Sequence, residues 1–220
     1  MVYALAMKLS NRRFLALVTF LLVIPLVGIA ATDGYVAPAD ATLVRPLPVG
    51  AKAPAFTARR PDGSAFQFDP ATRKVPAVII FYRGGWCPYC NAHLGSLKAA
   101  EGTLRARGYE VIFLSMDRPE ILRTSLKDDT ENEVAKYTLL SDASADAARA
   151  FHVAFRVDDD TYSKYKGFGI DLEAASGEKH HLLPVPAVYV IDRRGKIRFM
   201  HYNADYKVRL SADKLLAAAP

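Results

Sequence analysis

The two cysteines of this 220-residue chain stand three positions apart, in Trp86-Cys87-Pro88-Tyr89-Cys90. They follow an apolar run, residues 75–82, that predicts a buried strand, and precede residues 91–107, which predict a helix. Unpaired N–H groups and the dipole at a helix start favour negative charge, so a thiol there ionises more readily than a free thiol. The thiolate is the attacking species, and a second thiol one turn away can close a disulfide ring. The spacing therefore predicts dithiol–disulfide chemistry.

Zinc binding and a permanent structural disulfide are the other possible uses of this pair. His93 would extend it to Cys-x2-Cys-x2-His, but structural zinc needs four ligands and the chain has no second cysteine pair. We therefore expect redox chemistry with no metal and no organic cofactor. Cys87 is nearer the helix start, so its thiol is expected to have a lower pKa than that of Cys90. Pro88 suits the first turn, where its missing N–H costs nothing.

The N-terminal residues have the pattern of an export signal. Lys8, Arg12 and Arg13 precede an apolar run over residues 14–31, which ends in small residues. We expect residues 1–31 to be a signal peptide, or else a membrane anchor, because the run is near the lower length limit for a span. Residues 32–48 contain three prolines and predict an extended tether. The protein is thus expected to be exported, periplasmic or secreted, with membrane contact only through an uncleaved N-terminal segment.

Charge argues against a nucleic-acid partner. The formal net charge is +6, and Lys8, Arg12 and Arg13 supply three of these charges with no acid before Asp33, which leaves +3. That net charge is modest for a domain and is a weak argument for nucleic-acid binding. Export also sets the redox context, because in an oxidising compartment the cysteine pair becomes a disulfide unless a thiol redox partner protein reduces it.

Residues 49–220 are expected to form a single domain in which strands alternate with helices. The chain is expected to begin with a hairpin at residues 56–68. Three strands follow, at 77–82, 110–115 and 138–141, and each of them leads into a helix. A hairpin at 188–201 and a closing helix at 211–218 complete the predicted order. Such alternation predicts an α/β fold with a central mixed β-sheet flanked by helices on both faces. Residues 158–183 are too long for an ordinary connection, so we expect an insertion that lies over the active site.

Several of these motifs resemble a known family. Cys-x-x-Cys after a strand, and Pro186 just before a later strand, are similar to thioredoxin-fold proteins. Residues 49–56 and 190–197 resemble the opening and the closing hairpin of the alkyl hydroperoxide reductase and thiol-specific antioxidant family. Residues 81–90 resemble its peroxiredoxin-like branch. The resemblance covers residues 49–202 and implies a thioredoxin-like fold and an oxidoreductase.

The sequence departs from the peroxiredoxin pattern at the peroxide-binding positions. Aligning Phe81-Tyr82 with the family places Arg83 at its proline, Cys87 at its threonine and Cys90 at its peroxidatic cysteine, and the family's later arginine falls at Pro186. The dithiol pattern of thioredoxins is kept instead. The resemblance therefore leaves two assignments of the attacking thiol.

In the thioredoxin-like assignment, which we favour from sequence, Cys87 attacks protein disulfides and Cys90 resolves. Pro186 would then follow a cis peptide bond beside the sulfurs and present the Val185 backbone to a substrate strand. In the peroxiredoxin-like assignment, Cys90 attacks H2O2 or an alkyl hydroperoxide and Cys87 resolves, with Arg83 supplying positive charge.

Trp86, Pro88 and Tyr89 are candidate substrate-binding residues. Trp86 and Tyr89 are expected to flank the pair as an apolar contact surface, and the core is the alternative place for Trp86. A non-enzymatic exported binding module, with a permanent disulfide, is the remaining alternative for the whole chain.

Overall fold

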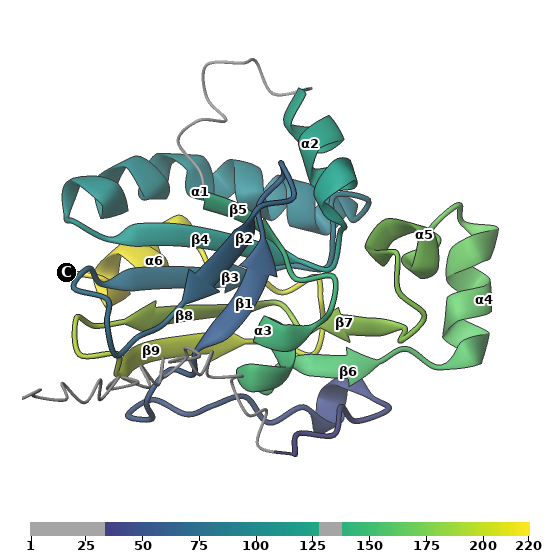
Figure 1. The fold of residues 1–220 in the computed structure, drawn as a ribbon, viewed down its shortest axis with the longest axis horizontal. Coiled ribbons are helices and arrows are strands. Elements are labelled where there is room, and N and C mark those ends of the chain that lie inside the picture. The colour runs from purple at the N-terminus through teal and green to yellow at the C-terminus, as the bar shows by residue number, and fades with distance from the viewer. Residues whose placement is uncertain (1–33, 128–137) are drawn as a thin grey trace, which may run out of the picture.

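A seven-stranded mixed sheet forms the centre of the molecule, as Figure 1 shows. The computed structural model describes residues 34–127 and 138–220, so the predicted signal peptide or anchor lies outside the described residues. Within those ranges no helix has the length and apolar character needed to span a membrane. The sheet order is β2-β1-β5-β4-β3-β8-β9. Its strands are β1 (Phe56–Arg59), β2 (Ala65–Phe68), β3 (Ala77–Phe81), β4 (Glu110–Ser115), β5 (Thr138–Ser141), β8 (Ala187–Ile191) and β9 (Ile197–Tyr202).

Strand β3 lies inside the sheet and leads to the cysteine pair. It pairs in parallel with β4 and antiparallel with β8, and all five of its residues are buried. Because side chains alternate across a strand, Ile79 and Phe81 enter the core on one face while Val78 and Ile80 enter the core on the other. A strand covered on both faces explains the uninterrupted apolar run in the sequence.

Helices cover both faces of this sheet. Helices α1 (Pro88–Ala106) and α6 (Ala212–Ala218) contribute to the core that contains both cysteines, and α3 (Asp146–Ala150) packs into the opposite core. Helix α2 (Pro119–Lys127) lies near β5. This arrangement confirms the predicted thioredoxin-like α/β fold.

Residues 34–48 lie against the domain, which corrects the expectation of an extended tether. The short 3-10 helix η1 (Ala41–Leu43) leads to Val44, which is completely buried. The Leu47 N–H donates to the Phe151 carbonyl, and the Arg156 N–H donates to the Pro38 carbonyl. The prolines of this segment stiffen a strap whose apolar residues find core contacts.

The predicted insertion consists of two helices and part of a small sheet. Helices α4 (Asp159–Gly167) and α5 (Leu172–Ser176) lie at one end of the molecule in Figure 1, next to the two-stranded sheet of β6 (Ala154–Arg156) and β7 (Leu182–Pro184). Asp158 and Asp171 accept the first free N–H groups of these helices, from Thr161 at 2.8 Å and Ala174 at 3.0 Å.

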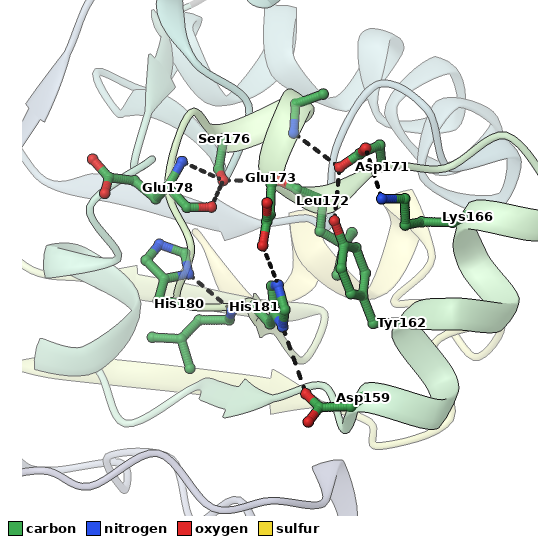
Figure 2. Close-up of polar contacts among 12 residues, drawn as sticks. Asp159, Tyr162, Lys166, Asp171, Leu172, Glu173, Ser176, Glu178, His180 and His181 are labelled. Carbon is green, nitrogen blue, oxygen red and sulfur yellow. Dashed lines mark hydrogen bonds and ion pairs between the residues drawn. The ribbon is translucent and has the colours of Figure 1, made fainter.

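Polar contacts inside the insertion hold its parts together (Figure 2). His181 Nε2 lies 2.8 Å from Glu173 Oε1, and the Tyr162 hydroxyl donates to Asp171 at 2.9 Å. The Tyr162 and His181 rings also pack together, with centroids 4.1 Å apart. These contacts join α4, α5 and the approach to β7, so the position of α4 is fixed relative to the sheet.

Candidate active site

Both cysteines lie at the start of α1, directly after the loop that leaves β3. Cys87 is the N-cap residue and Pro88 the first residue of the helix, which therefore begins three residues earlier than expected. The Cys87 carbonyl accepts from the N–H groups of Cys90 and Asn91 at 3.0 and 3.1 Å. The exposed fractions are 2% for Cys87 and 0% for Cys90, so neither thiol presents a broad surface to solvent.

Hydrogen-bond donors converge on the sulfur of Cys90. The Cys87 thiol and the Arg83 backbone N–H donate to it, and Arg209 Nη2 lies 3.4 Å from it. The Cys87 hydrogen bond and the Arg209 charge lower the pKa of the Cys90 thiol, although burial acts against this shift. The pKa of Cys87 is raised, first because its thiol is the donor in that hydrogen bond and then by burial. Both directions are opposite to those expected from the helix start alone, an argument that counted neither the hydrogen bond between the two thiols nor the cation beside Cys90.

Arg209 is the residue that sequence reasoning missed. It comes from the loop between β9 and α6, 119 positions after Cys90. His93 holds this loop, because its Nε2 lies 3.0 Å from the Leu210 carbonyl oxygen. Nothing local in the sequence marks Arg209, since only the fold brings that loop to the helix start.

Asp117 lies buried beneath the cysteine loop. Its carboxylate accepts from the Gly85 N–H at 2.6 Å and from the Ser115 hydroxyl at 3.2 Å. Burial raises its pKa to about 6. Space here is tight, because a Cβ on Gly84 would lie 2.7 Å from Asp117 Oδ1 and 2.3 Å from Trp86 Nε1. Asp117 thus fixes the loop that places Cys87.

Arg83 is surrounded by aromatic rings. Its guanidinium carbon lies 5.1 Å from the Trp86 ring centroid, 5.3 Å from that of Tyr165 and 4.4 Å from that of Tyr206. Its Nη2 also donates to the Tyr165 hydroxyl. Tyr165 belongs to α4, so the insertion contacts Arg83, which begins the loop that leads to the cysteines. Arg83 is only 4% exposed, which differs from a solvated charge at a strand end.

The segment before β8 does not have the geometry predicted for it. There is no cis peptide bond in the part of the chain that the structure describes, so Val185-Pro186 is trans and the cis prediction is wrong. Val185 is buried, and its N–H donates to the Val153 carbonyl at 2.9 Å, so this N–H is not free for a substrate strand. The reason is β7, which ends at Pro184 and runs extended into β8. Both Val185 and Pro186 line a cavity together with Arg83.

The remaining candidate residues lie around the pair as follows. Trp86 is partly buried against both cores, and Pro88 is exposed. Tyr89 is 44% exposed and packs edge-on against Tyr206 at 5.6 Å. His180 is partly buried, and its Nε2 lies 2.7 Å from the Ala143 carbonyl oxygen.

Comparison with known proteins agrees with this fold. Residues 49–200 match the family described as AhpC/TSA. No curated protein matches. Among solved structures, Prx3 from Vibrio vulnificus, in complex with H2O2, has a TM-score of 0.61 at 16% identity, with 79% of this chain and 99% of that chain covered. A putative thioredoxin reductase from Burkholderia cenocepacia has a TM-score of 0.60 at 19% identity over 79% and 98%. A yeast mitochondrial 1-Cys peroxiredoxin has a TM-score of 0.55 at 18% identity over 77% and 73%.

Proposed function

Because this chain belongs to the AhpC/TSA family, we propose that it is a thiol peroxidase in which Cys90 attacks the peroxide and Cys87 resolves the product. The observation that carries the proposal is that Arg209 Nη2 lies 3.4 Å from the Cys90 sulfur, where the Cys87 thiol and the Arg83 N–H also lower the pKa of the Cys90 thiol. These donors stabilise a thiolate at Cys90, and the thiolate is the nucleophile. The arrangement also compensates for the missing family arginine, since Arg209 brings a cation to the sulfur from another loop.

The proposed cycle has three steps. The Cys90 thiolate attacks the terminal oxygen of a hydroperoxide, the O–O bond breaks, and the leaving alkoxide takes up a proton, which gives Cys90 sulfenic acid and an alcohol or water. The Cys87 thiol then attacks the sulfenic sulfur, and water leaves as the Cys87–Cys90 disulfide forms. Two external thiols reduce this disulfide by exchange and become a disulfide themselves.

Thiol–disulfide exchange with protein substrates is the second candidate function. It is supported by the position of Cys87 as N-cap of α1 and by the exposed Tyr89 beside it, which offers a contact for a protein partner. In this version Cys87 attacks the substrate disulfide and Cys90 releases the product. The same pair would serve both functions, because the reduction step of the peroxidase cycle is itself a thiol–disulfide exchange.

The reductant and the compartment are parts of the proposal. A yeast relative in fold is described as resolved through glutathione and thioredoxin systems, which supports a thiol partner of that general kind here. We also propose export directed by residues 1–31, on the strength of their basic and apolar pattern.

Single-cysteine variants separate these functions. Because the chain has two cysteines, Cys87→Ser leaves Cys90 as its sole thiol, and Cys90→Ser leaves Cys87. We expect low peroxide to convert Cys90 in the Cys87→Ser variant to sulfenic acid, detected by dimedone adduct mass, at least tenfold faster than Cys87 in the Cys90→Ser variant. The opposite order, with mixed protein disulfides trapped by Cys90→Ser and insulin reduced by the unmodified protein, would establish thiol–disulfide exchange instead. Inactivity in both assays would leave the non-enzymatic module.

A further inference from the structure

A small cavity lies on the Arg83 side of the cysteine loop. Its volume is about 210 Å3, and its walls come from the strap at residues 39–41, from the insertion, from Val185-Pro186 and from Arg83. That volume corresponds to roughly seven water molecules and falls below the usual range for drug-sized ligands. The cavity therefore suits a molecule of only a few heavy atoms.

Arg83 gives this cavity a buried positive charge. Arg83 is only 4% exposed, no carboxylate among the described residues pairs with it, and its Nε has no hydrogen-bond partner there. Burying an unpaired charge is costly. The rings of Trp86, Tyr165 and Tyr206 offset part of that cost, but rings do not satisfy N–H donors. Because Arg83 lines the cavity, an anion there would lie beside this unpaired charge.

The other charged groups of the cavity lie at its outer part. Asp40 and Asp158 are exposed, and each accepts a backbone N–H of the short helix that it caps, from Thr42 and Thr161. Arg156 is also exposed and lies 3.2 Å from Asp159. Solvent screens these exposed charges, whereas it does not screen the buried guanidinium to the same extent. An anionic group is therefore favoured at the Arg83 end and disfavoured beside the two aspartates.

We propose that this cavity binds the carboxylate of a small organic redox reactant through Arg83. The proposal rests on the proposed function, because Arg83 joins the two sites: its backbone N–H donates to the Cys90 sulfur and its side chain lines the cavity. A planar guanidinium pairs with a carboxylate through two parallel hydrogen bonds. The carboxylate belongs to the oxidising hydroperoxide or to the reducing thiol, and the two sources are distinguished by experiment.

Binding can be measured without any turnover, because Trp86 is the only tryptophan and lies against Arg83. Sodium propionate should change its fluorescence saturably at constant ionic strength, and propionamide should not. Arg83→Met should weaken propionate binding at least tenfold. Arg156→Met removes the same charge from the exposed part of the cavity and should change binding less than twofold. No saturable change, or equal binding by Arg83→Met, would overturn the proposal.

A second measurement on the unmodified protein covers the case in which Arg83→Met does not fold. Phenylglyoxal modifies arginine side chains, and peptide mapping locates the modified positions. Propionate should protect Arg83 and leave Arg156 as reactive as before. Protection of both arginines, or of neither, would count against a site centred on Arg83.

Turnover then identifies the reactant. As reductants we compare 3-mercaptopropionate with the neutral 2-mercaptoethanol, and as oxidants monoperoxysuccinate with peracetic acid. At least a tenfold lower KM for the carboxylate-bearing member of one pair, lost in Arg83→Met but kept in Arg156→Met, names that pair as the source. No preference in either pair refutes the reactant role even if propionate binds. Failure of the proposed function itself looks different, because no peroxide would then be consumed with any reductant while propionate binding persisted.

Discussion

Replacing Arg209 with methionine should raise the pKa of the Cys90 thiol by about one to two units. Arg209 Nη2 lies 3.4 Å from the sulfur. At that distance a pair of unit charges attracts by about 5 kcal/mol at an effective dielectric constant of 20 and by about 1 kcal/mol in water. Arg209 is half-buried, so an intermediate value near 2 kcal/mol is appropriate, and about 1.4 kcal/mol corresponds to one pKa unit. The thiolate fraction at a pH below both pKa values should fall about tenfold to a hundredfold.

The assay uses the Cys87→Ser background, in which Cys90 is the sole thiol and serine still donates a hydrogen bond. Iodoacetamide alkylation rates measured from pH 4 to 10 give the pKa of that thiol directly, because the thiolate is the reactive form. Arg209→Lys keeps the positive charge and should recover most of the shift. Arg198→Met serves as the matched control, since Arg198 is exposed on β9 and its loss changes the net charge equally.

Two results would refute this reasoning. One is an unchanged alkylation pKa in Arg209→Met, which would mean that the guanidinium does not stabilise the thiolate. The other is a lower pKa for Cys87, measured in Cys90→Ser, than for Cys90 in Cys87→Ser, which would restore the helix-start argument.

Three further outcomes are expected. Asp117→Asn should stabilise the protein at pH 7.5 by up to about 3 kcal/mol, because the folded pKa of Asp117 is raised from 3.8 to about 6 and the wild-type protein loses stability as the pH rises through that window. Urea unfolding should show this gain in the free energy of unfolding shrinking toward pH 4. An equal gain at pH 4 and pH 7.5 would contradict the prediction. His93→Leu should loosen the loop that carries Arg209 and so raise the alkylation pKa of Cys90. His93→Gln can still donate to the Leu210 carbonyl, so it should raise this pKa less. Identical Cys90 pKa values in the two variants would show that the contact is not needed. Ile79→Ala should lower the free energy of unfolding by about 2–5 kcal/mol, and a loss below 1 kcal/mol would indicate that its core collapses around the gap.

The sheet could be predicted from sequence because each buried strand carries its own signal. The run over residues 77–82 is apolar at every position, and β3 is covered on both faces. The hairpin of β8 and β9 has the turn Asp192-Arg193-Arg194-Gly195, in which Gly195 has a φ of +74°. In such segments local preference and burial agree, so the elements follow from the pattern.

The helices inside the insertion and the packing of the strap against the domain could not be derived, for two different reasons. The start of each insertion helix is marked by an aspartate, Asp158 and Asp171, but the helices are short and polar and have little apolar periodicity to confirm these marks. The strap at residues 34–48 has the composition of a linker. Its attachment depends on distant partners such as Phe151 and Ala154, to which sequence spacing gives no guide.

The reversal between Cys87 and Cys90 shows where local reasoning about a thiol stops. The helix-start argument counts the free N–H groups and the dipole, effects worth about 0.3–1 kcal/mol at an exposed terminus. The structure adds a guanidinium from a loop 119 positions away and buries both thiols. Two buried thiols that share one hydrogen bond can hold a single negative charge at low free-energy cost, and the charge is favoured on the sulfur that accepts more hydrogen bonds. That sulfur belongs to Cys90, at the position of the family's peroxidatic cysteine, with Cys87 donating where the family has threonine. The dithiol spacing alone leaves the attacking residue open, and the proposed assignment to Cys90 rests on the Arg209 guanidinium beside its sulfur.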